Sequence, residues 1–195
     1  MPTYQIAGLT VHMDPQQKTL LRQSAAYACP EVAHPDIRIE LAQEFLEEKQ
    51  RKFPELTPDG CEYLWMGFSF YQKLLKFDGF VLHASAIAYG GRAYVFSAPC
   101  GTGKSTHAGL WCKSFGADNV TILNDDKPAL RLQNGVFYAY GTPFSGKTDQ
   151  SVNLGVPIAG ICVLEQATEN TIVRVTGRDA ILPIFHQVIN PPHNH

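Results

Sequence analysis

The spacing of apolar and polar residues predicts alternating helices and strands along most of the chain. Helical spacing of apolar residues predicts helices at 57–77, 106–115 and 181–189, and a charged helix is expected at 42–52. Short apolar runs and apolar–polar alternation predict strands at 5–13, 37–40, 80–89, 92–97, 120–123, 129–132, 136–140, 157–164 and 171–175. Gly90-Gly91 and Asn134-Gly135 each join two such runs and predict hairpins. The expected fold class is therefore α/β, of the mixed α+β kind.

The organisation of the chain changes near residue 57. Prolines interrupt the segment before it, where the apolar pattern is weak, whereas the patterns that follow are regular. Thr57 or Asp59 can cap the helix that begins there. We therefore expect residues 1–56 to form a strand and helix appendage that packs on a core domain of residues 57–195. A length of 195 residues suits one ordinary domain with such an appendage.

Composition narrows the classes of protein that fit. Apolar residues make up 45% of the chain and charged residues only 17%, so the chain can bury a core and is not expected to be disordered over most of its length. A formal net charge of −2 argues against binding nucleic acid through phosphate neutralisation. No apolar run approaches the roughly 18 residues that span a bilayer, and no secretory signal is seen, so a cytoplasmic location is expected. The five scattered cysteines argue against a disulfide framework or a structural zinc site.

Two segments match the phosphate-loop pattern, in which a glycine-rich turn is followed by Gly-Lys-Ser or Gly-Lys-Thr. Residues 98–105 match it with Ala98 at the first position, and residues 141–148 match it at every position. The pattern binds phosphate only between a strand and a helix N-terminus, because the helix supplies free N–H groups and the positive end of its dipole. An apolar run precedes 98–105 and a helical stripe follows it, whereas no helical periodicity follows 141–148, in which Phe144 would hinder the approach of phosphate. Only 98–105 is therefore expected to be a phosphate loop, and Lys147 is either a solvated turn lysine or a second contact to the same nucleotide or to a substrate.

Two further polar features lie near the expected loop. Asp125-Asp126 follows the apolar run 120–123, about twenty residues after Lys104, where a carboxylate can meet a magnesium–phosphate group. One carboxylate can hold the metal or its water, and the other can accept a proton from an incoming hydroxyl. An Asp-rich turn that opens the next hairpin is the structural alternative. His83 lies on an expected strand and, taken alone, favours a buried core histidine.

These segments together resemble the catalytic domain of the HPr kinase/phosphorylase family and, more distantly, ATP-dependent phosphoenolpyruvate carboxykinase. The resemblance is carried by Leu82-His83-Ala84-Ser85-Ala86, the loop 97–106, Asp125-Asp126 and the segment 141–165, under half of the chain. It implies a P-loop kinase core with a mixed sheet, in a chain that is either truncated at the C-terminus relative to the family or a minimal relative of it. Ala98 and the segment after Gly141 depart from the family pattern, so HPr itself is not expected as the acceptor.

The resemblance also implies a role for each matching residue. The implied nucleotide-binding residues are Pro99, Cys100, Gly101, Thr102, Gly103, Lys104, Ser105 and Thr106. Asp125 is the implied catalytic base, oriented by His83, and Lys104 is the third implied catalytic residue. Ser105 and Asp126 are the implied magnesium ligands. The implied cofactors are ATP and Mg²⁺, and the family's assembly into oligomers implies a homo-oligomer.

The sequence therefore predicts an ATP- and Mg²⁺-dependent kinase that transfers the γ-phosphoryl group to a hydroxyl-bearing acceptor of the serine type. That acceptor can be a small molecule, a peptide or a protein, and neither nucleic acid nor membrane is an expected partner. The alternative is a non-catalytic nucleotide-binding regulatory or interaction protein, which the loop stiffened by Pro99-Cys100 favours. A carboxykinase is disfavoured, because the chain lacks room for substrate-binding arginines and a second metal site.

Overall fold

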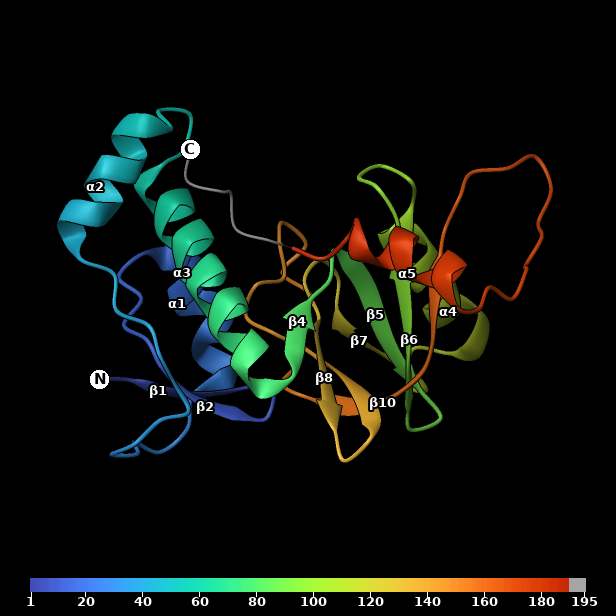
Figure 1. The fold of residues 1–195 in the computed structure, drawn as a ribbon, viewed down its shortest axis with the longest axis horizontal. Helices are drawn as coiled ribbons and strands as arrows, with labels where there is room; N and C mark the ends of the chain where they lie inside the picture. The colour runs from blue at the N-terminus through green and yellow to red at the C-terminus, as the bar shows by residue number, and fades with distance from the viewer. Residues whose placement is uncertain (190–195) are drawn as a thin grey trace.

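The computed structural model of the chain describes residues 1–189 and has two lobes (Figure 1). The first lobe contains β1 (Thr3–Ile6), β2 (Leu9–His12), α1 (Lys18–Ser24), β3 (Ile37–Arg38), α2 (Gln43–Lys52) and α3 (Pro58–Leu74). The second contains β4 (Gly79–Val81), β5 (Ala84–Tyr89), β6 (Arg92–Ser97), α4 (Lys104–Phe115), β7 (Val120–Asn124), β8 (Ala129–Gln133), β9 (Val136–Tyr140), β10 (Gly155–Val163) and α5 (Arg178–Phe185). The mixed α+β class is confirmed. Residues 190–195, the end of the expected core domain, lie outside the described residues.

The first lobe is built around α3, which Thr57 caps by accepting a hydrogen bond from the Gly60 N–H at 3.1 Å. The apolar face of α3 shares one core with the N-terminal strands and α1, including Phe70, Leu74, Ile6, Val11 and Leu20. The expected strand 5–13 is instead the hairpin β1–β2. Ala7 and Gly8 turn the chain there with positive φ angles of 53° and 73°, a conformation that glycine adopts without penalty.

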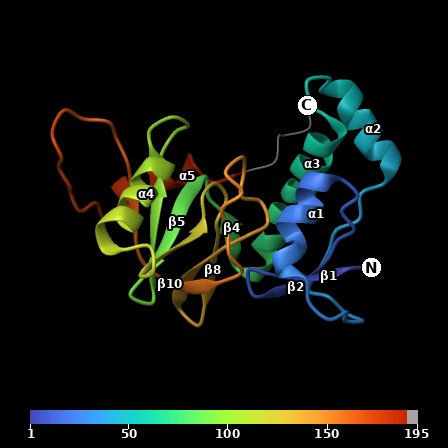
Figure 2. The same cartoon turned by 180° about the vertical axis from the view of Figure 1, so that it is seen from behind.

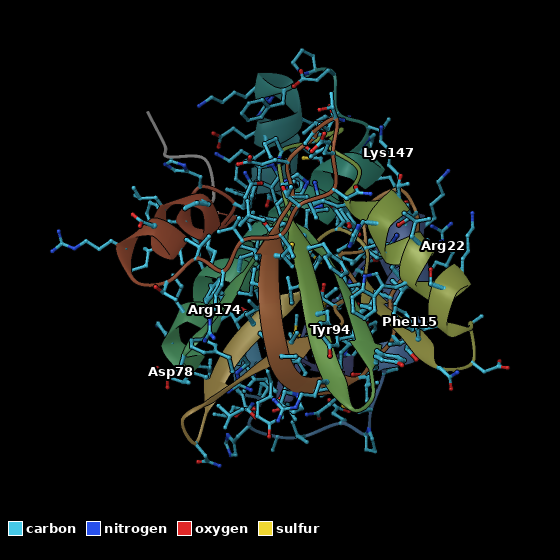
Figure 3. All side chains as sticks on the ribbon, turned by 90° about the vertical axis from the view of Figure 1, so that its right-hand side faces the viewer. Arg22, Asp78, Tyr94, Phe115, Lys147 and Arg174 are labelled. Atoms are coloured by element: carbon cyan, nitrogen blue, oxygen red, sulfur yellow. The ribbon has the colours of Figure 1, made fainter. Side chains whose placement is uncertain are left out.

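The sheet of the second lobe places several loops at one edge. Its strand order is β4-β8-β9-β10-β6-β5-β7, in which β6 is parallel to β10, and β5 is antiparallel to both β6 and β7. The carboxyl ends of β6 and β7 and the start of β5 therefore lie at the same edge. Helices α4 and α5 lie on opposite sides of these strands (Figure 3).

The sequence patterns and the structure differ at three further places. Residues 80–89 form two strands rather than one, because the chain breaks between β4 and β5 at Leu82-His83. The expected strand 171–175 has no partner strand and lies in an extended, exposed segment, where Ile172 is 90% exposed. The helix expected at 181–189 is α5, which ends at Phe185. The last described residues, from Gln187 to Ile189, pair instead with the chain at β4.

No helix among residues 1–189 is both long enough and apolar enough to cross a bilayer.

Candidate functional site

A cavity of about 1000 Å³ lies between the two lobes. The second lobe lines it with His83, Cys100, Gly101, Gly103, Lys104, Ser105, Thr106, Asp125, Asp126, Lys127, Ser145, Gly146, Lys147 and Thr148. The first lobe lines it with Thr19, Arg22, Gln23, Asp59, Gly60 and Tyr63. The cavity therefore brings together the loop 98–105, the acidic doublet, His83 and, on the same surface, the second glycine-rich loop 141–148.

The loop 98–105 has the strand before it and the helix after it that the sequence predicted. It leaves β6 after Ser97 and enters α4 at Lys104, with Gly103 as the N-cap. Gly101 and Gly103 have positive φ angles of 82° and 112°, and nothing lies within 4 Å of the position where a Cβ would be. No side chain caps α4, and no acceptor is found among the described residues for the N–H groups of its first turn, whose residues line the cavity. Together these features form a cradle for an anion at a helix N-terminus.

Lys104 is buried and lies inside this loop. Its Nζ donates to the carbonyl oxygen of Ala98 at 2.9 Å and to that of Pro99 at 3.2 Å. Burial lowers the pKa of Lys104, and the negative groups around it, including Asp126 and Asp125, oppose that shift. The ammonium group is thus held at the cradle by its own loop.

The second loop, 141–148, is a turn and not a phosphate loop. It follows β9, and no helix follows it before β10. Phe144 is fully buried and stacks on Phe70, with ring centroids 5.8 Å apart. The tip of the loop, which includes Ser145 and Lys147, forms a wall of the cavity. Figure 3 labels Lys147 beyond one end of the central strands.

The two adjacent carboxylates have different surroundings. Asp125 is buried, and its Oδ1 accepts a hydrogen bond from the Ser85 hydroxyl at 2.5 Å. Asp126 is more exposed, forms an ion pair with Lys127, and has its Oδ1 3.7 Å from His83 Nε2. His83 was expected to orient Asp125. Its ion-pair contact is with Asp126 instead, because β5 begins at Ala84, whose N–H bonds to the Asp126 carbonyl oxygen at 3.1 Å.

His83 is held by a residue that the sequence patterns did not suggest. Its Nδ1 lies 3.2 Å from Gln187 Oε1, and the two residues are also joined by a backbone hydrogen bond of 2.8 Å. Burial lowers the pKa of His83, the charge of Lys104 lowers it further, and Asp126 and Gln187 partly oppose the shift. When Gln187 Oε1 accepts from Nδ1, Nε2 is left facing Asp126 and the cavity. No spacing signal links residues 104 positions apart, so sequence reasoning had no route to Gln187.

Helix α1 is the other part of the site that the sequence patterns missed. It has only seven residues and no side-chain cap of its own. Two carboxylates of α3 take that role: Glu62 accepts from the N–H groups of Gln16 and Gln17 at 2.8 Å each, and Asp59 accepts from the Thr19 N–H at 2.8 Å. Figure 2 shows α1 beside the orange loop between β9 and β10. Gln23 contacts that loop through a hydrogen bond of 3.2 Å from its Nε2 to the Gly146 carbonyl oxygen.

The residues at the cavity fit a magnesium ion that arrives with a nucleotide. Within residues 1–189, no three His, Cys, Asp or Glu side chains are grouped so that they could hold a metal by themselves. A nucleotide-bound Mg²⁺ needs only one or two carboxylates, because phosphate oxygens and water complete its shell. The Ser105 hydroxyl and the carboxylates of Asp125 and Asp126 line the same cavity and supply that kind of oxygen donor.

Comparisons with known proteins give a family. A search of curated proteins finds no match. A family model described as SynChlorMet cassette protein ScmC matches residues 61–185, more than half of the chain. The resemblance to the HPr kinase/phosphorylase family was therefore the wrong assignment, because the model that matches the segment carrying His83, the loop 98–105 and the acidic doublet is that of ScmC. The match begins in α3 and ends with α5, so it covers the second lobe and leaves α1 outside. The chain belongs to the ScmC family.

Proposed function

We propose that this protein binds ATP with Mg²⁺ at the loop 98–105 and transfers the γ-phosphoryl group to a hydroxyl-bearing acceptor. The observation that carries the proposal is the meeting, in one cavity, of an anion cradle at the start of α4 and an acidic doublet at the end of β7. Both features lie at the same sheet edge because β6 and β7 run in the same direction on either side of β5.

The loop would hold the phosphates of the nucleotide. The free N–H groups at the start of α4 donate to phosphate oxygens, which the open space at Gly101 and Gly103 admits to the backbone. Lys104 would exchange its two carbonyl partners for phosphate oxygens, and its charge then offsets the negative charge on the transferred group. A P-loop kinase core is thus part of the proposal.

The two carboxylates would have different roles, one in binding the metal and one in accepting the proton. Ser105 with one carboxylate would hold Mg²⁺, which would supply charge neutralisation at the phosphates. Asp125, anchored by Ser85, is a fixed oxygen donor and suits the metal. Asp126 is more exposed and lies beside His83, so it suits the transfer of a proton from the acceptor hydroxyl. This order is the reverse of the roles implied by the sequence resemblance.

Nucleotide binding can be tested without turnover. Cys100 is the exposed cysteine in the loop, whereas the other four cysteines are buried or half-buried. We expect Mg·ATP to slow alkylation of Cys100 at least tenfold, read by intact-protein mass spectrometry. Lys104→Ala should abolish the protection, and Lys147→Ala, on the second loop, should retain it. If the protection depended on Lys147 and not on Lys104, the phosphates would lie on the loop 141–148, and the proposal would be refuted.

Turnover separates the two carboxylates. Asp126→Asn should lower ADP formation in the presence of an acceptor at least a hundredfold while leaving Mg·ATP binding intact, the size of effect usual for general base catalysis. Asp125→Asn should weaken the dependence on Mg²⁺, seen as a higher Mg²⁺ concentration for half-maximal rate. Full activity in Asp126→Asn would remove Asp126 from the proton transfer.

A nucleotide-binding module without turnover is the second candidate. It is favoured by the contacts of Lys104, whose ammonium group is satisfied by its own loop, and by those of Asp126, which already pairs with Lys127. Mg·ATP protection of Cys100 with no ADP formed for any acceptor would support this candidate over the kinase.

A further inference from the structure

We propose that the wall formed by α1 and residues 145–148 binds the acceptor, and that the acceptor is a small hydroxylated anion with a carboxylate or phosphate group beside its hydroxyl. The inference rests on the proposed phosphoryl transfer and adds to it the substrate class. The starting observation is size. A cavity of about 1000 Å³ is at the upper end of the range that holds a single ligand, so there is room for an acceptor beside the nucleotide.

Polar atoms without partners lie on this wall. Ser145 is fully buried and its Oγ has no hydrogen-bond partner, and Gln23 is 6% exposed with no partner for its Oε1. The Tyr63 hydroxyl accepts from the Gly146 N–H at 3.0 Å, and its own proton has no acceptor among the described residues. Buried polar groups are nearly always paired, so such groups beside a cavity indicate a ligand. Together they offer two donors and one acceptor, which suits hydroxyl groups because a hydroxyl both donates and accepts.

The charges of the wall favour an anion. Lys147 is exposed on the loop, and no acidic partner is found for it in the part of the chain that the structure describes. Arg22 uses its Nε on Asp149, 2.8 Å away, which leaves the terminal nitrogens of the guanidinium group available. The nearby carboxylate of Asp59 is already satisfied by the Thr19 backbone and hydroxyl. A ligand that reaches this wall therefore meets the ammonium group of Lys147 and the terminal guanidinium nitrogens of Arg22, both of which can donate to an anion.

The burial of the polar groups limits the size of the acceptor. Ser145 and Gln23 are almost fully buried beside the cavity, so only a small group would fit against them and the surface of a folded protein would not. In the transfer, the bond from the γ-phosphorus to the bridging oxygen breaks and its electron pair leaves with ADP. The acceptor oxygen forms the new bond to phosphorus, and its proton passes to Asp126.

The test uses the full chain with Mg·ATP and measures ADP formation with four probes. D-glycerate and L-malate carry a hydroxyl and a carboxylate, glycerol 3-phosphate carries hydroxyls and a phosphate, and glycerol is the uncharged match. We expect at least one of the anionic probes to raise the rate tenfold or more above glycerol. The first two probes against the third distinguish a carboxylate from a phosphate as the anionic group.

Variants of wall residues test whether the acceptor binds at this wall. Lys147→Ala, at an exposed turn position, should raise KM for the active probe at least tenfold with unchanged Kd for Mg·ATP, and Ser145→Ala should also raise KM. Lys113→Ala, an exposed lysine of α4 outside the cavity, is the matched control and should change neither constant.

Failure of the acceptor inference can be distinguished from failure of the proposed function. If Mg·ATP binds through Lys104 but no anionic probe exceeds glycerol, the acceptor inference is overturned and the nucleotide site stands. If Lys147→Ala weakens Mg·ATP binding instead, the wall binds nucleotide and the inference is overturned as well. If Mg·ATP does not bind, the proposed function fails first, and the inference fails with it.

Discussion

Asp126 is positioned by its neighbour Lys127 and by contacts from two separate parts of the chain. Lys127 pairs with it, His83 faces it from the start of β5, and Gly146 packs against it from the second loop. A Cβ on Gly146 would lie 2.5 Å from Asp126 Oδ2 and 2.9 Å from its Cβ, closer than atoms can approach. The second glycine-rich loop thus has a glycine at its tip because the acidic doublet lies beneath it.

The first prediction follows from that contact. Gly146→Ala should push the Asp126 carboxylate away and lower the proposed turnover at least tenfold, while a φ of 66° costs about 1–2 kcal/mol of stability. Gly135→Ala is the matched control, because Gly135 has a φ of 79° and no atom near its Cβ position. Thermal unfolding should show both variants destabilised, Gly146→Ala more than Gly135→Ala because of the added clash, and ADP formation by the folded protein should fall only in Gly146→Ala. Equal activity in the two variants would contradict the role of the contact.

The second prediction concerns the protonation of His83. Its pKa in the folded protein lies below the unfolded value of about 6.5, so the unfolded chain binds more protons in the window between the two. Folding stability therefore falls as the pH drops through that window and stops falling below the folded pKa. Urea unfolding between pH 7.5 and pH 5 should show a smaller loss of stability for His83→Gln than for the parent protein. NMR titration of the His83 ring should give a pKa below 6.5, and a value above it would reverse the sign and refute the prediction.

At the scale of elements, the loop 141–148 matches the phosphate-loop sequence pattern, but it packs into the hydrophobic core instead of binding phosphate. Phe144 stacks on Phe70 and meets Tyr71 edge-on, with ring centroids 5.4 Å apart in the second pair. The backbone of the loop is also fixed at Thr142, whose hydroxyl donates to the Lys127 carbonyl oxygen at 2.8 Å. Because the buried ring of Phe144 and the hydroxyl of Thr142 fix the loop in this conformation, its backbone cannot surround a phosphate.

The third prediction separates the two ends of this loop. Phe144→Ala should lower the free energy of unfolding by about 3–5 kcal/mol, because it leaves a cavity in an aromatic core. Lys147→Ala, at an exposed position in the same loop, should stay within about 0.5 kcal/mol of the parent. Denaturant unfolding measures both. A small loss for Phe144→Ala would mean that the ring is not the anchor of the loop.

Elements that depend on local signals could be predicted from the sequence, and those that depend on distant partners could not. The strand, loop and helix around Lys104 and the hairpin at Asn134-Gly135 follow from local spacing and turn residues, and both were predicted. Helix α1 was missed because its cap comes from Glu62, whose contact is 45 residues away in the chain. The strand expected at 171–175 has the right alternation but no neighbouring strand to pair with, and alternation alone does not form a sheet.

The candidate site shows the same division. The residues that line the cavity from the second lobe were found as motifs, because glycines, a lysine and paired carboxylates stand out in a lightly charged chain. Gln187 and Gln23 carry no motif, and only the fold brings them to His83 and to the loop tip. The partner of His83 was predicted as Asp125 rather than Asp126, since adjacent residues at a strand end cannot be told apart without the backbone direction.

At the scale of the whole molecule, the cavity exists because two lobes meet, and the family match covers only one of them in full. Contacts of two kinds hold the cavity together, one between the lobes and one within the first lobe. Arg131 of β8 is buried and donates to the carbonyl oxygens of Ala7 at 2.7 Å and Phe77 at 3.1 Å, which ties the N-terminal hairpin to the sheet. Glu62 and Asp59 fix the start of α1 on α3. The wall of the cavity is therefore only as rigid as the attachment of α1.

The last prediction tests that attachment. Glu62 is 2% exposed and both of its oxygens accept backbone N–H groups, so Glu62→Gln turns one acceptor into a donor that faces another donor. We expect a loss of about 1–3 kcal/mol, the cost of a buried group left unpaired. Amide hydrogen exchange should quicken in α1 and remain unchanged in α4, because α4 is held by the sheet and not by α3. Glu48→Gln, at an exposed position of α2, should change neither measurement. Exchange that quickens equally in α1 and α4 would show that Glu62 supports the whole fold rather than the cavity wall.

Slower phosphoryl transfer by Glu62→Gln, with Mg·ATP binding intact, would link the attachment of α1 to the acceptor side of the site.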